Sequence, residues 1–398
     1  MISVIYWVLM AVLLSFSILF TANISINWLV VLPIISIGAI ISIVKSKKNP
    51  EFIQYSLAIK PSNRIPVYDY IRCLAVILVV VFHTLNWDLN EAADLSGTGL
   101  YMGLDSLRWW TLVCNALFIM ISGALLLPYK EESVIEFYKK RLIRIAIPLI
   151  VYFIWYLWQY DKLKAMTPWE VVVSICTADV DNSNVNHFWI IYMMLLIYVT
   201  VPFLRGWLKK LSYAQLTGLV FAIFVFSAVG IFTPIFGYSI ITLIGYIFVA
   251  ILGYWVTREE SRKYDIELII IGVACSGIMF KMKDEFAYFE PLVHNLSILR
   301  LGICLGIFSL FIKLKHCLKD NYILRIINKY SYSIMLIHMW ALYFVTRKLV
   351  PISSVMYHGL GLIVSALITM IISTIAAYLI DNLIVNIFMS FLTIKNNK

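Results

Sequence analysis

The sequence predicts an all-α, polytopic integral membrane helical bundle, with about ten core transmembrane helices plus an N-terminal pair. Hydrophobic residues make up 62% of the 398 residues, charged residues make up 14%, and the mean hydropathy is +0.89. A soluble domain has about 45–50% apolar and about 25% charged residues, so a soluble fold is excluded, and so is disorder. The apolar residues form long unbroken runs, which suit spanning helices and exclude the alternating strands of a membrane β-barrel.

A transmembrane helix needs about 20 mostly apolar residues. By this criterion the sequence predicts spans at residues 3–22, 27–45, 68–88, 109–128, 145–160, 187–208, 215–233, 238–256, 266–281, 296–313, 331–346 and 359–382. The first run lacks a basic leader and is followed at once by the second run, so we expect a retained helix rather than a signal peptide. Residues 45–66 carry prolines and charges and read as a linker on the inner face. We therefore expect a two-helix preamble with its linker over residues 1–66 and a core domain over residues 67–398.

The net charge of +10 comes from 32 Lys and Arg residues that lie mostly in short segments between the apolar runs. With the N-terminus inside, roughly three quarters of the positive charge falls on the inner side, which is the positive-inside pattern. The outer segments 88–107 and 161–186 are instead rich in Asp, Asn and Glu. We expect both termini to be cytoplasmic, in a cell membrane of bacterial plasma-membrane type, with membrane lipids and no nucleic acid as partners. We also expect an amphipathic helix within residues 161–186, lying on the outer face of the bilayer.

The six cysteines show no metal-ligand spacing, and most of them fall inside apolar runs. A thiol in such a run behaves as a small hydrophobic group. We therefore expect the cysteines to be structural, with neither a metal site nor a disulfide.

The third predicted span carries a polar stripe. Arg72 and His83 are eleven positions apart, so they lie within about 20° of each other around a helix and roughly 16 Å apart along its axis. Asp69 and Asn86 fall near the same face. An ionisable residue inside a span is costly and marks a polar pathway. The alternative is that Arg72 reaches the headgroups while His83 is a packing residue.

These residues also resemble a known family. The stretch from Tyr68 to Asn86, with Arg72 and His83, looks like the signature of the acyltransferase-3 family of integral membrane acyltransferases. Similar segments follow in order at residues 118–123, at 137–144 before Pro148, at 187–189 before Pro202, and at 332–338. The resemblance covers about residues 65–385 and is closest to the surface polysaccharide O-acetyltransferase-like branch. Residues 1–66 are additional to the pattern. No extracytoplasmic esterase-like domain follows residue 385, which leaves a separate extracytoplasmic transferase as a possible partner.

The resemblance implies a membrane O-acyltransferase with a ten-helix core. It implies acetyl-CoA or another acyl-CoA as the cytoplasmic donor, and a hydroxyl of a cell-surface or lipid-linked glycan as the acceptor of an acyl group, expected to be acetyl. It also implies Arg72 and His83 as the functional pair. Histidine is well suited to removing a hydroxyl proton near neutral pH, so we expect His83 to activate the acceptor and Arg72 to bind CoA.

Further candidate residues lie on both sides of the predicted membrane. Tyr138, Arg141 and Arg144 belong to a segment that we expect to be a basic cytoplasmic loop binding the CoA phosphates, because arginine forms forked hydrogen bonds with phosphate. The neighbouring lysines are explained by topology alone. For acceptor binding the candidates are Asp69, Asn86, His187, Trp189, Arg300 and His338. The alternatives are an interfacial anchor for Trp189, packing for the histidines, and charge balance or snorkelling for Arg300.

A polytopic transporter or a flippase of a lipid-linked sugar is the alternative class of function. About twelve helices with buried ionisable groups also describe many carriers. A common carrier has two similar halves, however, and the spacing of Arg72 and His83 has no counterpart in the second half of this sequence. The sequence therefore favours an enzyme.

Overall fold

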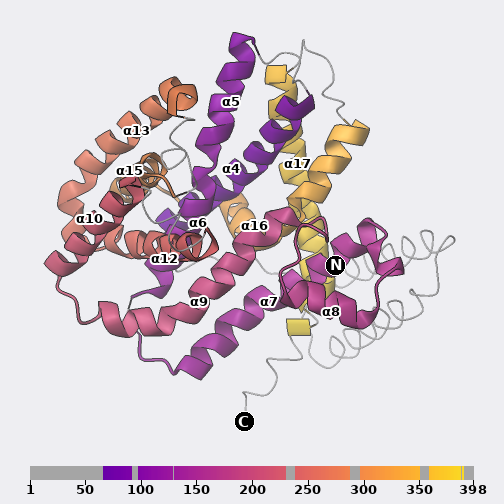
Figure 1. Cartoon of the computed structure of the whole chain (residues 1–398), viewed down its shortest axis with the longest axis horizontal. Helices are drawn as coiled ribbons and strands as arrows, with labels where there is room; N and C mark the ends of the chain where they lie inside the picture. The colour runs from indigo at the N-terminus through magenta and orange to yellow at the C-terminus, as the bar shows by residue number, and fades with distance from the viewer. Residues whose placement is uncertain are drawn as a thin grey trace. The chain divides into compact units, whose positions relative to one another are not determined.

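The computed structural model describes residues 66–91, 97–128, 130–229, 238–286, 296–349, 358–386 and 388–389. These residues form helices and turns, and no β-strand occurs among them (Figure 1). The predicted all-α fold is confirmed. The predicted spans at 3–22 and 27–45 lie outside the described residues.

Within the described residues each predicted span of the core falls on helical structure, and the span at 109–128 crosses from one helix to the next at Leu112. The long helices are α4 (Pro66–Glu91), α5 (Gly99–Thr111), α6 (Val113–Leu126), α7 (Val134–Gln159), α9 (Trp189–Leu208), α10 (Tyr213–Val229), α12 (Tyr238–Val256), α13 (Asp265–Phe286), α15 (Ile298–Lys313), α16 (Tyr322–Phe344) and α17 (His358–Ile380). Shorter elements are η2 (Lys162–Lys164), α8 (Pro168–Cys176), η3 (Asn186–Phe188) and η4 (Glu259–Tyr264), with π-helical turns η5 (Val345–Leu349) and η7 (Asp381–Val385). Within the described residues, five helical segments are long and apolar enough to cross a membrane: Pro66–Glu91, Gly99–Leu126, Val134–Gln159, Asn186–Leu208 and Leu360–Val385.

Helical structure begins well before three of the predicted spans: α5 begins at Gly99, ahead of the span predicted at 109–128, and α7 and α16 also begin early. Helix α7 begins at Val134 and α16 at Tyr322, so the segment from Tyr138 to Arg144 is helical, and the prediction of a basic loop there is wrong. A hydropathy window detects only the part of a helix that is apolar on all sides. The early segments of α7 and α16 alternate charged and apolar residues at helical spacing, which extends a helix beyond its apolar part.

The chain divides into two compact units. Of the described residues, those between 66 and 139 and between 192 and 374 form the larger unit, and those between 140 and 191 and between 375 and 389 form the smaller unit. The larger unit therefore holds α4, α5, α6, α10, α12, α13, α15 and α16.

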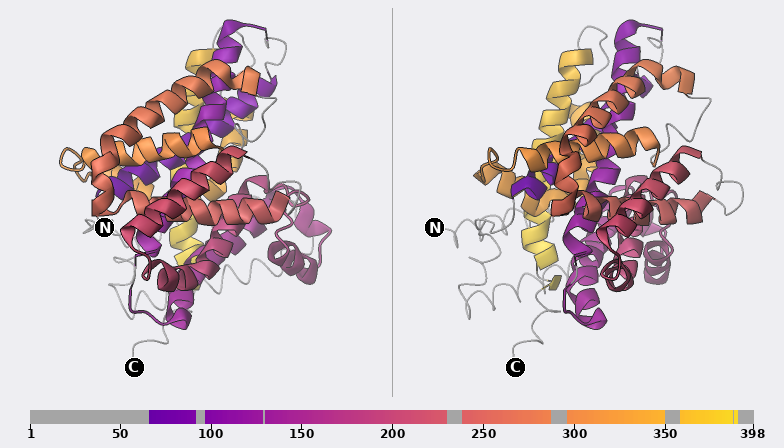
Figure 2. Two further views of the ribbon diagram at one scale, coloured as in Figure 1. Left: turned by 60° about the vertical axis from the view of Figure 1, so that its left-hand side comes forward. Right: turned by 90° about the vertical axis from the view of Figure 1, so that its left-hand side faces the viewer.

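Helices of the larger unit pack closely where both partners carry glycine. Helices α13 and α15 lie side by side (Figures 1 and 2). A Cβ atom placed on Gly272 would lie 2.8 Å from the Cα atom of Gly306, and one placed on Gly306 would lie 2.8 Å from the Cα atom of Gly272. Small residues let two membrane helices approach to backbone contact, which replaces the hydrophobic driving force that is absent between helices in lipid.

Helices α6 and α12 cross in the same way. A Cβ atom on Gly123 would overlap the main chain of Ala250, and one on Gly253 would overlap the main chain of Met120. Helix α6 also contacts α4 and α15, so it is central to the packing of the larger unit.

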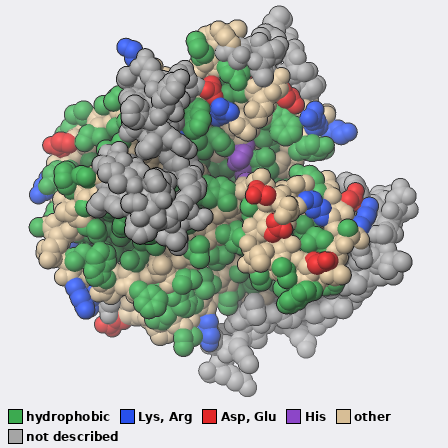
Figure 3. Space-filling model, viewed as in Figure 1, with side chains coloured by type: hydrophobic (Ala, Val, Ile, Leu, Met, Phe, Trp, Pro, Cys, Tyr) green, Lys and Arg blue, Asp and Glu red, His purple; other side chains and the backbone are tan. Residues whose placement is uncertain are grey.

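Large hydrophobic side chains remain exposed along the outer faces of the helices. Phe203, Phe221, Val273 and Leu360 are among the most exposed of them. Hydrophobic side chains cover much of the face drawn in Figure 3. Such a surface is expected of helices that face lipid rather than water.

The smaller unit contains the helix expected within residues 161–186. Helix α8 begins with a capping box, in which the Thr167 hydroxyl accepts a hydrogen bond from the Glu170 amide and the Glu170 carboxylate accepts one from the Thr167 amide. These bonds hold the pKa of the Glu170 carboxyl below its usual range. Trp169 is 72% exposed, and Val172 is exposed with it. The helix is present, and its place on the bilayer stays a prediction.

Candidate active site in the larger unit

The candidate site is built on α4 and α16, which run parallel. Near the start of both helices, the Tyr70 hydroxyl donates a hydrogen bond to the carbonyl oxygen of Lys319 at 2.8 Å. Near the end of both, the rings of Trp87 and Tyr343 have centroids 6.2 Å apart. A parallel pair agrees with the predicted topology, in which both spans cross the membrane in the same direction.

His83 and His338 lie beside each other at the contact between these helices. Their ring centroids are 4.9 Å apart with an interplanar angle of 46°. His338 is 1% exposed, and its Nδ1 atom lies 2.8 Å from the carbonyl oxygen of Met335. Because a carbonyl oxygen only accepts, Nδ1 carries the proton of this bond, and in an uncharged ring Nε2 is then the acceptor atom. Two imidazole rings from distant parts of the sequence thus meet inside the larger unit.

The polar stripe of α4 turns toward neighbouring helices rather than toward the surface. Asp69 and Arg72 form an ion pair at 3.5 Å, with side chains that are 10% and 17% exposed. Ile77, well away from this stripe around the helix, is exposed. The residual exposure of Arg72 allows an anion to reach its guanidinium group, which carries five N–H donors.

At the other end of the stripe, Asn86 contacts α5, and Arg300 of α15 contacts the same helix. The Asn86 Oδ1 atom accepts a hydrogen bond from the Arg108 Nη1 atom at 3.1 Å, and Arg108 is ion-paired with Asp105. The Arg300 Nη2 atom donates to the carbonyl oxygen of Trp109 at 3.4 Å, and its guanidinium group lies 5.7 Å from the centroid of that ring. Arg300 is 1% exposed, so its side chain lies within the helix packing.

The residues expected to bind CoA lie on α7. The Tyr138 hydroxyl donates a hydrogen bond to the carbonyl oxygen of Val199 at 2.6 Å, so it ties α7 to α9. Arg141 and Arg144 stand three positions apart and share one face of the helix. Arg144 is exposed and Arg141 is half-buried. Both arginines belong to the smaller unit.

The start of α7 is fixed by a buried arginine of α9. Arg205 donates to the Leu126 carbonyl oxygen, lies 3.4 Å from the Glu132 carboxylate, and holds its guanidinium group 4.8 Å from the centroid of the Phe137 ring. The Arg205 side chain therefore satisfies a carbonyl group at the end of α6 and also packs against the first turn of α7. The sequence did not indicate this role, because Arg205 is separated by a whole helix from the residues that it contacts.

His187 and Trp189 stand at the entry to α9, in the smaller unit. The His187 ring lies 5.2 Å, centroid to centroid, from the ring of Tyr156, with an interplanar angle of 67°. Tyr156 in turn stacks on Tyr160. His187 is thus part of an aromatic cluster at the end of α7.

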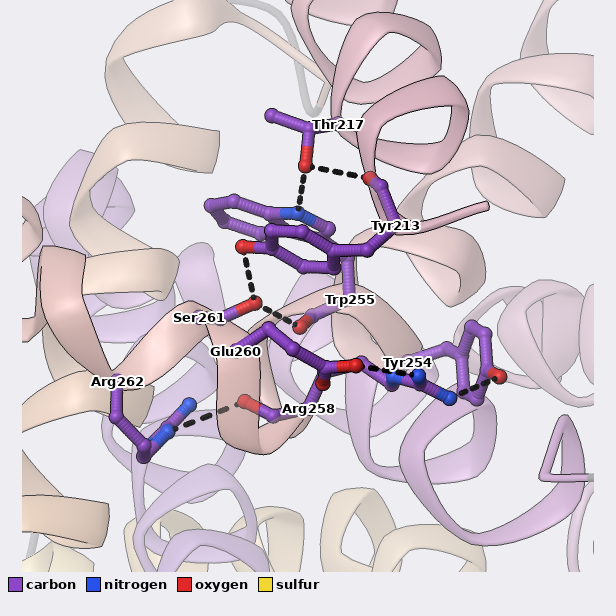
Figure 4. Close-up of polar contacts among 8 residues, drawn as sticks. All are labelled: Tyr213, Thr217, Tyr254, Trp255, Arg258, Glu260, Ser261 and Arg262. Carbon is purple, nitrogen blue, oxygen red and sulfur yellow. Dashed lines mark hydrogen bonds and ion pairs between the residues drawn. The ribbon is translucent and has the colours of Figure 1, made fainter. Parts of the chain in front are cut away.

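A further polar network joins α10, α12 and η4 (Figure 4). The Ser261 hydroxyl accepts a hydrogen bond from the Tyr213 hydroxyl at 3.1 Å and donates one to the carbonyl oxygen of Trp255 at 2.7 Å. Arg258 donates hydrogen bonds to the Glu260 carboxylate at 2.9 Å and to the Tyr254 hydroxyl at 3.1 Å. The hydrogen bond from Arg258 lowers the pKa of the Glu260 carboxyl. Arg258 therefore has partners within the protein and serves to hold this turn.

No group of three or more His, Cys, Asp or Glu side chains that could hold a metal ion occurs in the described part of the chain.

Comparison with known protein families gives a match. The model of a family described as an acyltransferase domain matches residues 65–381, which is most of the chain. No curated protein and no solved structure matches the chain. The matched range includes α4 and α16, and hence both histidines of the pair.

Proposed function

Because the chain belongs to the acyltransferase-3 family, and is accordingly a multi-pass membrane acyltransferase, we propose that it moves an acyl group from cytoplasmic acyl-CoA to a hydroxyl of a cell-surface or lipid-linked glycan. Acetyl is the group that we expect. The observation that supports this proposal is the pairing of His83 with His338, on a helix that also carries Arg72.

In the proposed reaction, His83 removes the proton from the acceptor hydroxyl while the hydroxyl oxygen attacks the carbonyl carbon of the thioester. The new C–O bond forms, the C–S bond breaks, and the CoA sulfur leaves with the proton that His83 took up. His338 acts as a positioning residue that holds the His83 ring. Two positively charged rings at this distance would repel each other, so during the reaction the pair holds at most one proton beyond those of two neutral rings.

The donor is held by cationic groups in this proposal. Arg72, oriented by Asp69, binds a phosphate of CoA, and Arg141 and Arg144 bind others through forked hydrogen bonds. Tyr138 supports this face through its bond to α9. Of the side chains expected to bind the acceptor, Asp69 and His338 take the orienting roles given above, and the others are Asn86, Arg300, His187 and Trp189.

The test is the release of free thiol from acetyl-CoA by purified protein in lipid nanodiscs, with acylated glycan measured by mass spectrometry. A positioned base contributes about 10²–10⁴-fold in rate, so His83→Ala should lose nearly all transfer. His338→Gln should lose less than His83→Ala, because it removes only support for the ring. His316→Ala, in an exposed loop, is the matched control and should keep full activity.

The outcomes separate the alternatives. Full transfer by a folded His83→Ala variant would refute the general-base role, and activity retained by His83→Gln would reduce His83 to a hydrogen-bonding group. Movement of a lipid-linked sugar across the bilayer without any CoA turnover would indicate a carrier instead.

A further inference from the structure

A group of aromatic and charged side chains lies just beyond the histidine pair, at the ends of α4 and α16. The Trp87 and Tyr343 rings meet edge to face, with an interplanar angle of 79°. The Arg347 guanidinium group lies 5.3 Å from the centroid of the Trp87 ring and 3.5 Å from the Glu91 carboxylate. We call Trp87, Glu91, Tyr343 and Arg347 the mouth cluster. None of them was singled out by the sequence.

The backbone beneath the mouth cluster is irregular. Arg347 belongs to the π-helical turn η5, which follows α16 directly. Turns of this kind are rare and occur frequently at functional sites. Here the turn carries Arg347 at the point where its side chain reaches both Trp87 and Glu91.

The mouth cluster continues the site one helical turn beyond His83. Residues three and four positions along a helix lie on either side of the starting residue and about 4.5–6 Å farther along the axis. Asn86 and Trp87 hold these positions, so they flank the face of α4 that carries His83. Arg108 fixes Asn86 on one side, and Tyr343 and Arg347 pack on Trp87 on the other.

The chemistry of these groups matches an uncharged sugar. Aromatic faces pack against the C–H groups of a pyranose ring, while guanidinium and carboxylate groups exchange hydrogen bonds with its hydroxyls. Each cation is paired with an anion, Arg108 with Asp105 and Arg347 with Glu91. The cluster therefore offers no excess charge to attract an acidic sugar.

Two further features indicate a ligand. The side chain of Tyr343 is 48% exposed and that of Arg347 is 55% exposed, so the cluster is accessible. The Trp87 Nε1 atom is buried, and no acceptor for its N–H occurs within the described ranges. A buried donor without an acceptor calls for an explanation, and a sugar hydroxyl would supply the acceptor.

We infer that the mouth cluster is a binding subsite for a neutral pyranose unit of the acceptor, next to the unit whose hydroxyl His83 activates. This inference rests on the proposed function for the identity of the acceptor. The competing explanation is that Trp87 and Tyr343 only anchor the protein at the membrane surface, as aromatic residues commonly do.

The experiment measures binding without turnover. The full-length protein is placed in nanodiscs free of glycoside detergent, and equilibrium dialysis measures its binding of labelled neutral tetrasaccharides of glucose, galactose or N-acetylglucosamine. The variants are Trp87→Ala, Trp87→Phe and Arg347→Met. Trp169→Ala is the matched control, because Trp169 is 72% exposed on α8 and is also expected at the outer surface.

We expect wild-type protein to bind at least one neutral tetrasaccharide. Trp87→Ala should weaken that binding about tenfold, which corresponds to about 1.4 kcal/mol. Trp87→Phe should retain most of it, and Trp169→Ala should bind as the wild type does. A labelled tetragalacturonate should bind more weakly than the neutral sugars.

Three results would overturn the inference: no binding of any neutral tetrasaccharide by the wild type, equal binding by Trp87→Ala, or a preference for the acidic sugar. Thiol release from acetyl-CoA is measured on the same preparations. Sugar binding that depends on Trp87, without any acyl transfer, would refute the proposed function and leave the sugar subsite standing. Acyl transfer together with sugar binding that is unchanged in Trp87→Ala would refute the sugar subsite and leave the proposed function standing.

Discussion

Replacing Gly272 with alanine tests whether α13 and α15 are held together by backbone contact. The new Cβ atom would lie 2.8 Å from the Cα atom of Gly306, whereas ordinary contact begins at 3.4 Å. The neighbouring main chain cannot rotate away as a side chain could, so the two helices must separate by about 0.6 Å. A gap of about 0.5–1 Å forfeits a quarter to a half of each dispersion contact across the interface.

The expected loss is the usual cost of overpacking, about 1–3 kcal/mol in the free energy of unfolding. Gly277→Ala is the matched control, because Gly277 lies on the same helix and a Cβ atom there meets nothing within 4 Å. Both substitutions gain the same helix propensity, about 1 kcal/mol in favour of alanine. The difference between the two variants therefore isolates the overpacking.

The assay is equilibrium unfolding in mixed micelles, driven by SDS and followed by far-ultraviolet circular dichroism. We expect Gly272→Ala to unfold at a lower SDS fraction than the wild type, and Gly277→Ala to unfold at the same fraction or a higher one. Coincident transitions for the two variants would show that α13 and α15 do not meet at Gly272 and Gly306.

Three further predictions concern the donor side and α8. Arg72→Ala should raise the KM for acetyl-CoA at least tenfold in the thiol-release assay while leaving the binding of a tetrasaccharide unchanged, and an unchanged KM would remove Arg72 from the donor site. Replacing both Arg141 and Arg144 by glutamine should raise the same KM and weaken its dependence on salt. A KM equal to that of the wild type would mean that the two arginines contribute to membrane topology and not to donor binding. Because the pKa of Glu170 is lowered in the folded protein, its support of the Thr167 cap should be complete at neutral pH and lost as the pH falls through the lowered value. Amide hydrogen exchange of α8 should then show protection that falls on acidification, and Glu170→Gln should abolish that pH dependence.

The sequence predicted the helices of the core because burial in lipid imposes one strong pattern, a long apolar run, and each such run became a helix. It predicted less well where helices leave the apolar region. The segments 134–144 and 322–330 carry charges at helical spacing, so a search for apolar runs passed over them. For this reason a loop was expected at residues 137–144, where the structure has the start of helix α7.

The site was predictable on one helix and not between helices. The spacing of Arg72 and His83 follows from helix geometry alone, and so does the stripe that they form. That His338 should meet His83 depends on how α4 and α16 pack, which a single sequence does not record. The mouth cluster was missed for the same reason, although Trp87 directly follows Asn86. Its significance comes from Arg347 and Tyr343, on an element far away in the sequence.

The parallel pairing of α4 with α16 also has a consequence for biosynthesis. About 250 residues separate His83 from His338, so at the usual rate of synthesis of about 5–20 residues per second the first histidine enters the membrane tens of seconds before its partner exists. During that interval α4 must be shielded by its neighbours or by the insertion machinery, since a polar stripe facing lipid is costly. Chains that stop before α16 would thus hold the stripe without the histidine pair. Such truncated chains would lack the support that His338 is proposed to give the His83 ring, so acyl transfer should reach its full rate only once α16 has been made.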